Sequence, residues 1–364
     1  MKLVYVANSI VPSRTANSIH IMKMCAALAR NGNDVTLCVP QRPERAEIPA
    51  DVYNFYGVPP SFRIHHLPWL RVTGRGVAFA WQAARLARRE RADLLYGRLV
   101  HACYMAARRG VPAIFESHAP IEAYDRWGTL LFERLIRRPQ FRRLIVISNA
   151  LRDHYERRYP GLAGSIRVAP DAADDVATPP VRPRSGGLKA GYVGHLYPGR
   201  GIELIAALAE QCPWAEFHLI GGLERNIAEW RGRCTGRSNI MFHGFRAPSE
   251  VQSYISELDV LLAPYQRAVA TYGERVETSR WMSPLKIFEY MAAGKPMVVS
   301  DLPVLREVLD ESNSILVEPE DVAGWVRALK VLRDEDLRQR LGQEARRCFL
   351  QSHTWDKRAR AVLA

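Results

Sequence analysis

A lysine and a glutamate stand three residues apart in the segment SPLKIFEYMAAGKP, which spans residues 283–296. Ser283 is a favourable N-cap and Pro284 a favourable first helical residue, so a helix is predicted here with Lys286 at its third position. Because that end of a helix carries about half a positive charge, a lysine is normally unfavourable there. A bound phosphate would remove the conflict, since the helix end and the ammonium group would both neutralise it.

The glutamate, Glu289, shares a helix face with Lys286. A carboxylate beyond a phosphate can accept two hydrogen bonds from a ribose diol, as acidic residues do in dinucleotide sites. The plainer interpretation is a surface Lys–Glu pair, which stabilises a helix by about 0.2–0.5 kcal/mol. The two residues therefore indicate either a nucleotide site or an ordinary charged helix face.

A glycine-bearing turn in the segment YVGHLYPGRGIELI (residues 192–205) is a second candidate for anion binding. The segment predicts a strand, a turn from Gly194 to Gly201 that contains Arg200, and then a helix. Such a turn presents backbone N–H groups and a cation to an anion. Glycine turns open many helices, however, and a turn arginine is often merely solvated, so the loop gains weight only together with the lysine helix.

Alternating strands and helices must position these residues. Apolar, β-branched strands separated by helical stretches indicate parallel sheets covered on both faces, whose ligands bind beyond the carboxyl ends of the strands. The proline- and glycine-rich segment TPPVRPRSGG interrupts the alternation and reads as a linker at residues 178–187. The strands are predicted at residues 2–8, 34–40, 93–98, 112–117 and 143–148 before it, and at 189–196, 216–222, 239–245, 259–265, 295–301 and 314–319 after it.

The sequence thus predicts an α/β protein with two doubly wound domains and a cleft between them as the site. The expected boundaries are a first domain at residues 1–177, the linker, a second domain at 188–350 and a C-terminal helix at 351–364 that packs back on the first domain. No apolar run approaches the ~18–20 residues needed to cross a bilayer. Met1 leads directly into a strand rather than a secretion signal, so we expect a cytoplasmic protein.

The six cysteines are scattered and form no C-x-x-C pair, so they read as reduced, buried side chains. The formal charge of +13 arises in the first half of the chain. Residues 1–185 contain 28 Lys and Arg but only 15 Asp and Glu, whereas the rest of the chain contains 23 basic and 23 acidic residues. Such a basic field indicates an anionic partner, whether nucleic acid, an anionic bilayer or a phosphorylated substrate. A compositional habit is the alternative, because only 7 of the 51 basic residues are lysine.

Several segments in a fixed order resemble the family-4 retaining glycosyltransferases. Residues 283–309 are similar to the donor-site segment of that family, and the resemblance extends over nearly the whole chain. It implies the GT-B fold, in which two facing Rossmann-like parallel-sheet domains enclose a central cleft. In that fold residues 1–177 would be the acceptor-binding domain and residues 188–350 the nucleotide-sugar donor domain. The other segments that carry it are VISNALRDHY, RVAPDAAD, YVGHLYPGRGIELI, FHGFRAPSEV and HTWDKRARAVL.

The resemblance implies a role for each candidate residue. Glu289 would hold the ribose of a nucleotide sugar, Phe245 would line the base pocket, and His118 of FESHAP would reach the transferred sugar from a strand end. Considered alone, His118 would read as a loop histidine with its hydrogen bonds satisfied. The remaining donor-binding residues, around the diphosphate, would be Gly194, Arg200, Pro284, Leu285 and Lys286.

The sequence departs from the family pattern at the first of two glutamates spaced eight positions apart, where Trp281 stands instead. Either the transferred sugar is held differently or a carboxylate of the preceding segment, Glu274 or Glu277, replaces the missing one. The family's arginine before the phosphate lysine is His195 here, and that lysine is Arg200.

The N-terminal loop near the diphosphate or acceptor also departs from the pattern. The positions of its paired glycines are occupied by Thr15 and Ala16, followed by Asn17 or Ser18 as the expected helix cap.

The expected chemistry is rupture of the bond from the anomeric carbon to the diphosphate, with Arg200 and Lys286 neutralising the leaving group. No Asp-x-Asp or histidine cluster of metal-ligand type stands in a suitable place, so we expect neither metal nor cofactor. Retention of configuration is implied by the family. We expect the acceptor to attack the face that the phosphate leaves, and the phosphate oxygen to take its proton.

The donor would be a UDP- or GDP-sugar and the acceptor a glycan, a lipid-linked molecule or a small molecule, as in polysaccharide or lipopolysaccharide biosynthesis. The basic first domain suits weak peripheral binding to the inner face of a membrane. Solvated faces of an arginine-rich protein are the alternative. The arginines concerned are Arg85, Arg88 and Arg89 on one predicted helix face, and Arg134, Arg137 and Arg138 beside the apolar run LLF on another.

Two other classes of function compete with this reading. A nucleic-acid binder would explain the charge, but the chain has neither a recognition helix nor a stacking motif, and its second half is neutral. An epimerase or phosphorylase on the same two-domain plan would explain the loss of the carboxylate at Trp281. A hydrolysis product with the donor's anomeric configuration would favour transfer over release of an epimer.

Overall fold

The computed structural model describes residues 1–41, 51–70, 73–124, 126–176, 187–268 and 279–364. Contacts divide the chain into two compact units. The first contains Met1–Pro170 and Trp355–Ala364, and the second contains Asp171–Thr354. The chain therefore leaves the first unit after Pro170 and returns to it at Trp355, whereas most of the expected linker lies outside the described residues.

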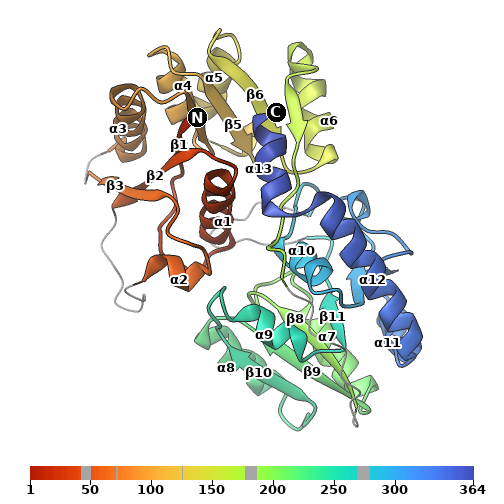
Figure 1. Cartoon of the computed structure of the whole chain (residues 1–364). Coiled ribbons are helices and arrows are strands. Elements are labelled where there is room, and N and C mark those ends of the chain that lie inside the picture. The colour runs from red at the N-terminus through yellow and green to blue at the C-terminus, as the bar shows by residue number, and fades with distance from the viewer. Residues whose placement is uncertain (42–50, 71–72, 125, 177–186, 269–278) are drawn as a thin grey trace. The chain divides into compact units, whose positions relative to one another are not determined.

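The first unit is built on a seven-stranded parallel sheet with the order β3-β2-β1-β4-β5-β6-β7 (Figure 1). Most residues of its inner strands are apolar and buried, as expected for parallel strands between helices. The strands are β1 (Lys2–Val6), β2 (Asp34–Gln41), β3 (Arg63–Pro68), β4 (Leu94–Gly97), β5 (Ala113–Ser117), β6 (Phe141–Val146) and β7 (Ile166–Val168).

Helices cover both faces of this sheet. Helices α3, α4 and α5 form one packed layer, and α13 packs against α1, which Figure 1 shows in blue and red. The C-terminal helix is thus part of the first unit. The helices are α1 (Ala16–Arg30), α2 (Val52–Tyr56), α3 (Arg75–Arg89), α4 (Val100–Ala107), α5 (Arg126–Leu135), α6 (Asn149–Arg158) and α13 (Trp355–Leu363).

The second unit contains a six-stranded parallel sheet with the order β10-β9-β8-β11-β12-β13. Its strands are β8 (Leu188–Val193), β9 (Ala215–Ile220), β10 (Ile240–Gly244), β11 (Val260–Ala263), β12 (Met297–Ser300) and β13 (Ile315–Val317). Its helices are α7 (Ile202–Gln211), α8 (Glu224–Arg233), α9 (Val251–Ser256), α10 (Leu285–Ala292), α11 (Val322–Val331) and α12 (Glu335–Ser352).

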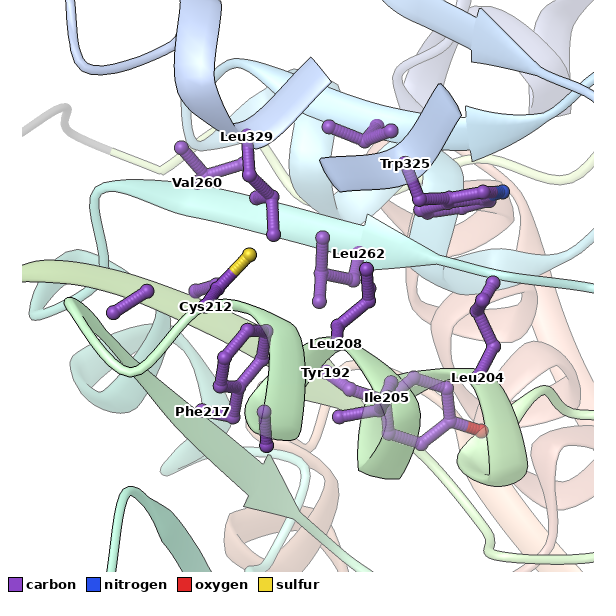
Figure 2. Packing of buried hydrophobic residues seen from close by; sticks show 14 of the residues in the cluster. Tyr192, Leu204, Ile205, Leu208, Cys212, Phe217, Val260, Leu262, Trp325 and Leu329 are labelled. Atoms are coloured by element: carbon purple, nitrogen blue, oxygen red, sulfur yellow. The ribbon is translucent and has the colours of Figure 1, made fainter. Parts of the chain in front are cut away.

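Successive residues of the strands in the second unit enter two separate hydrophobic cores. Val260 and Leu262 of β11 pack in one core, and Leu261 and Ala263 pack in the other. Figure 2 shows the first core, in which residues of α7 and α11 meet those of β8, β9 and β11. Because side chains alternate across a strand, this division means that helices bury the sheet on both faces. The doubly wound architecture expected from the sequence is confirmed.

Candidate functional site

The helix that carries the lysine begins one residue later than predicted. Helix α10 starts at Leu285, with Pro284 in the N-cap position and extended at φ −75° and ψ 122°. The prediction of Ser283 as the N-cap is wrong, because its hydroxyl oxygen instead accepts a hydrogen bond of 2.7 Å from the backbone N–H of Asp171. Lys286 is therefore the second helical residue, still within the first turn.

Lys286 is buried, with 9% of its surface exposed. Its Nζ lies 3.6 Å from the ring centroid of Tyr192 and 5.2 Å from that of Tyr265. Within the described residues this ammonium group has no hydrogen-bond partner. Burial, followed by the nearby Arg200 guanidinium, holds the pKa of Lys286 well below its ordinary value, although Glu289 opposes the shift. Two aromatic faces compensate only part of the cost of burying a cation, so the position favours an anionic ligand.

The glycine turn lies directly against this lysine. Gly194 has φ +141°, and a Cβ placed on it would lie 3.0 Å from Nζ of Lys286. At Gly201, with φ +77°, a Cβ would lie 1.9 Å from the carbonyl oxygen of Pro264, so only glycine fits this turn. Arg200, between them, places its guanidinium 5.4 Å from the ring centroid of Tyr265. The structure therefore brings Gly194, Arg200 and Lys286 together at the carboxyl end of β8.

Glu289 lies one turn further along α10 and is half-buried. Its charge contributes to the raised pKa of Tyr265, which burial dominates, so the carboxylate belongs to the same cluster. The helix is fixed on the sheet by the hydroxyl of Tyr290, which accepts from the N–H of Val193 at 2.9 Å and donates to the carbonyl of Leu262 at 3.3 Å. The cationic and acidic side chains predicted from spacing thus share one end of one sheet.

The other predicted residues of the second unit lie near the same loops. Phe245 follows β10 directly and is half-buried. His195 stacks on Tyr197 with ring centroids 4.8 Å apart, and its carbonyl accepts a hydrogen bond from the Tyr192 hydroxyl at 2.7 Å. Trp281 is half-buried, with the Arg280 guanidinium 5.3 Å from its ring centroid. Glu274 and Glu277 lie outside the described residues, so their proposed replacement role stays a prediction.

In the first unit, His118 follows β5 and faces a buried carboxylate. Its Nε2 lies 2.5 Å from Oε1 of Glu116, whose side chain is fully buried. Burial, reinforced by the Arg98 guanidinium, lowers the pKa of His118 to about 4, although Glu116 opposes the shift. The imidazole is therefore neutral at pH 7. As expected for a loop histidine with a hydrogen-bond partner, His118 follows the strand and its Nε2 bonds to Glu116.

The residues around Glu116 were missed by the sequence analysis. Arg358 of α13 donates to Glu116 at 3.0 Å, and His20 of α1 lies 3.1 Å from the same oxygen. The hydroxyl of Tyr96 donates to the other oxygen. A signal for Glu116 was present, because residues two apart in a strand point to the same face. Nothing in the sequence pattern pointed to His20 or Arg358.

Helix α1, which follows the N-terminal loop, has a different N-cap residue than expected. Thr15 is the N-cap of α1, and its hydroxyl accepts from the N–H of Ser18 at 3.3 Å. The expectation of Asn17 or Ser18 as the cap is wrong, because Ala16 already starts the helix. The side-chain oxygen of Asn17 instead accepts a hydrogen bond from Arg98, which follows β4. Asn17 thus bonds a residue that acts electrostatically on His118.

Two family models match almost the whole chain. Residues 18–175 match the model described as Glycosyltransferase Family 4, and residues 200–364 match the model described as Glycosyl transferase-like. A curated relative is the putative teichuronic acid biosynthesis glycosyltransferase TuaH of Bacillus subtilis, which is 30% identical over 117 residues. That match covers 32% of this chain and 28% of the relative, so it spans less than a third of the relative's length.

Solved structures share the fold over nearly their full length. Sucrose-phosphate synthase from Thermosynechococcus elongatus superposes with a TM-score of 0.74 at 17% identity, covering 98% of this chain and 96% of its own. HepE from Anabaena, in complex with UDP and glucose, gives 0.73 at 13% identity, with coverages of 100% and 98%. Two Rossmann-like parallel sheets with these neighbours define a GT-B protein. The chain belongs to the family-4 glycosyltransferases, as its motifs indicated.

Proposed function

We propose that this chain is a retaining glycosyltransferase that moves a sugar from a nucleotide-diphosphate sugar to an acceptor. The observation that carries the proposal is the buried ammonium of Lys286, which has no hydrogen-bond partner in the described chain and stands beside Arg200. Cleavage of the donor develops negative charge on the leaving diphosphate, and fixed cations in a site of low dielectric stabilise that charge. Retention rests on the family resemblance, with the acceptor attacking the face that the diphosphate leaves.

The donor is proposed to be a UDP- or GDP-sugar whose ribose hydroxyls bond to Glu289. The UDP named for the Anabaena HepE structure supports the uridine nucleotide. We propose that Phe245 lines the base, and that the segment from Pro284 to Lys286 at the start of α10 binds phosphate through the backbone N–H groups of Leu285 and Lys286. The acceptor is proposed to be a glycan or lipid-linked molecule, in keeping with the teichuronic acid biosynthesis named for TuaH.

We propose that the reaction needs no metal, because cationic side chains supply the positive charge that would stabilise the diphosphate. Among the described residues, one group of possible metal-ligand atoms lies close together, on His20, Glu116 and His118. Its carboxylate is already paired with Arg358 at 3.0 Å. At the donor end, Arg200 and Lys286 supply the positive charge that a divalent cation would otherwise bring to a diphosphate.

A thermal-shift panel tests the donor site. The panel compares UDP-, GDP-, ADP- and dTDP-sugars with and without a chelator. One of these donors should raise the midpoint of thermal unfolding, because a ligand at one hundred times its Kd adds about 2.7 kcal/mol to the unfolding free energy. Glu289→Ala should abolish that shift, whereas Glu335→Ala, on an exposed turn of α12, should retain it. A shift that survives in Glu289→Ala would place the ribose elsewhere. Slow hydrolysis of the winning donor should release a sugar of unchanged anomeric configuration, and an epimer would contradict transfer.

The layer of α3, α4 and α5 is proposed to bind an anionic membrane surface weakly. Arg85, Arg88 and Arg89 are exposed on α3. The same helix exposes 43% of Trp81, whose ring lies 5.4 Å from the Arg85 guanidinium. On α5, Trp127 is 57% exposed. Tryptophan with flanking arginine is typical of surfaces that adsorb to anionic lipid.

The second arginine group differs from the prediction. Arg134, Arg137 and Arg138 are exposed but do not share a helix face, because α5 ends at Leu135. The run LLF is not exposed either, since Phe132 packs in the core. Among the described residues, no helix combines the length and the apolar character needed to span a bilayer.

Vesicle binding tests the membrane proposal. The protein should sediment with vesicles that contain anionic phospholipid at low salt and should be released as salt screens the charges. Arg85→Glu with Arg89→Glu, or Trp81→Ala with Trp127→Ala, should each reduce the bound fraction several-fold. The matched control is Arg231→Glu with Arg233→Glu on α8, which makes the same charge change in the other unit. Equal loss in the control, or no binding at low salt, would remove the proposal.

A further inference from the structure

A fully buried carboxylate organises the end of β5 in the first unit. Glu116 has no exposed surface, and its Oε1 lies 2.5 Å from His118 Nε2 and 3.1 Å from His20 Nε2. Arg358 donates to Oε1 at 3.0 Å, and the Tyr96 hydroxyl donates to Oε2. Four side chains thus surround one carboxylate, and they come from α1, β4, α13 and the residue that follows β5. Such a network is rigid when every member is satisfied.

Arg358 fixes this carboxylate from the far end of the chain. Its guanidinium is 3% exposed and also donates to the carbonyls of Pro170 at 2.8 Å and Ala169 at 3.2 Å. These two residues end the segment through which the chain leaves the first unit. Trp355 of the same helix packs edge-on against His20, with ring centroids 5.3 Å apart. Helix α13 therefore supplies both the counter-charge and part of the wall of the cluster.

The contact with Glu116 selects one form of His118. A carboxylate oxygen at 2.5 Å from Nε2 requires the hydrogen of the neutral imidazole to lie on Nε2. Nδ1 then carries the lone pair, and within the described part of the chain no hydrogen bond occupies it. The imidazole side chain is 18% exposed, whereas Glu116 and His20 are at most 2% exposed. The one accessible ring of the cluster thus presents a hydrogen-bond acceptor.

We propose that Glu116 and Arg358 are positioning residues of the transfer site, which hold His118 as the Nε2–H tautomer so that Nδ1 accepts a hydrogen bond from a substrate hydroxyl. This inference rests on the proposed function. Glu116 orients the ring through Nε2, as the carboxylate partner of a catalytic histidine does in other enzymes. Arg358 balances the negative charge of the Glu116 carboxylate. The single imidazole hydrogen of His118 therefore stays on Nε2, where it bonds to Glu116, and Nδ1 stays unprotonated.

The charges that face His118 explain why both residues are needed. Burial and the Arg98 guanidinium lower the pKa of His118 to about 4, and the Glu116 carboxylate opposes them. His20, from α1, also lowers this pKa, and Arg358, from α13, pairs with the carboxylate. Without Arg358, Glu116 would be uncompensated and would favour the doubly protonated ring. In Glu116→Gln, by contrast, the side-chain amide can either accept from Nε2–H or donate to an unprotonated Nε2, so the two neutral tautomers would mix.

The tautomer of His118 can be measured directly in the full chain. Long-range ¹H–¹⁵N spectra of histidine-labelled protein distinguish the two neutral tautomers and the imidazolium, and His118→Gln identifies the signals by their loss. The wild-type protein should show Nε2–H at pH 7 with titration near pH 4. Arg358→Met should move that titration upward by at least one pH unit, and Glu116→Gln should give mixed tautomers. Arg360→Met, an exposed change on the same helix, should leave both unchanged.

Turnover supplies the second measurement. Glu116→Gln and Arg358→Met should lower kcat about ten- to hundredfold with the KM for the donor within about twofold, because the proposed donor-binding residues lie in the other unit. If Arg358→Met does not fold, the double variant Glu116→Gln with Arg358→Met leaves no lone buried charge and should show mixed tautomers. Unchanged His118 spectra in Glu116→Gln, or in the double variant, would overturn the proposal. The expected spectra in a protein that transfers no sugar would overturn the proposed function alone.

Discussion

Replacement of Lys286 by methionine should abolish donor binding while making the ligand-free protein more stable. The ammonium is buried with no hydrogen-bond partner among the described residues, so methionine of similar length removes an uncompensated charge. The same charge is the proposed partner of the leaving diphosphate. Loss of one such electrostatic contact costs about 10²–10³ in rate, or about 3–4 kcal/mol. A gain of about 1–2 kcal/mol in the unfolding free energy is expected without ligand.

Urea unfolding and donor turnover of Lys286→Met measure the two effects. The matched control is Lys295→Met, because Lys295 donates to the carbonyls of Leu258 at 2.6 Å and Ser256 at 3.1 Å. That lysine is satisfied, so its replacement should lower the unfolding free energy and leave donor binding intact. A Lys286→Met protein that is less stable than wild type yet binds donor normally would place the diphosphate elsewhere.

The same lysine should make stability depend on pH. Since the pKa of Lys286 is lowered in the folded state, the unfolded chain binds more protons between that lowered value and the ordinary value of 10.5. Stability therefore rises with pH through this window, and the rise should be smaller in Lys286→Met. A bound diphosphate should favour the charged form and raise the pKa of Lys286. Calorimetry of donor binding in buffers of different ionisation enthalpy should then detect proton uptake within the same pH window.

The sequence located the strands with continuous apolar runs and missed the two edge strands of the first unit. All six strands of the second unit fall within or beside their predicted ranges, because continuous apolar runs bounded by turns identify parallel strands. In the first unit, β3 and β7 were not predicted. Both lie at the edges of the sheet and are short or largely exposed, so their apolar pattern is weak. The prediction of Ser283 as a helix N-cap was wrong for a different reason. Its hydroxyl accepts a hydrogen bond from the backbone N–H of Asp171, a residue distant in sequence.

The two clusters of candidate residues, one in each unit, differed in the same way. Lys286 stood out because a cation conflicts with the local helix end, which is visible within one segment. The partner of Glu116, in contrast, is 242 residues away in sequence, and Arg358 sits in a helix with several other charged residues. No local rule distinguishes a buried arginine from its solvated neighbours before the fold is known. A local conflict therefore pointed to the proposed donor-binding residues, whereas only the tertiary structure pointed to the residues proposed to position His118.

Removal of Arg358 should cost the first unit more stability than most single substitutions do. The pair with Glu116 is almost entirely buried, and loss of one partner from such a pair costs about 3–5 kcal/mol because the other charge is left uncompensated. Arg358→Met should therefore unfold the first unit at clearly lower urea concentration. Glu116→Gln with Arg358→Met should recover most of the loss, since two neutral side chains leave no lone charge.

The pH dependence of this pair has a defined sign. Burial alone would raise the pKa of Glu116, but Arg358 and His20 outweigh it and hold the pKa well below its ordinary value of 4.5. A carboxyl with a lowered folded pKa stabilises the protein above its unfolded pKa, and this contribution is lost as pH falls through the folded value. The difference in stability between wild type and Arg358→Met should therefore be largest at pH 6–8 and shrink in acid, where Glu116 becomes protonated. Arg30→Met, which breaks an exposed pair with Asp356, should cost only about 0–1 kcal/mol. An equal loss in Arg30→Met and Arg358→Met would show that the guanidinium of Arg358 is not held in a buried pair.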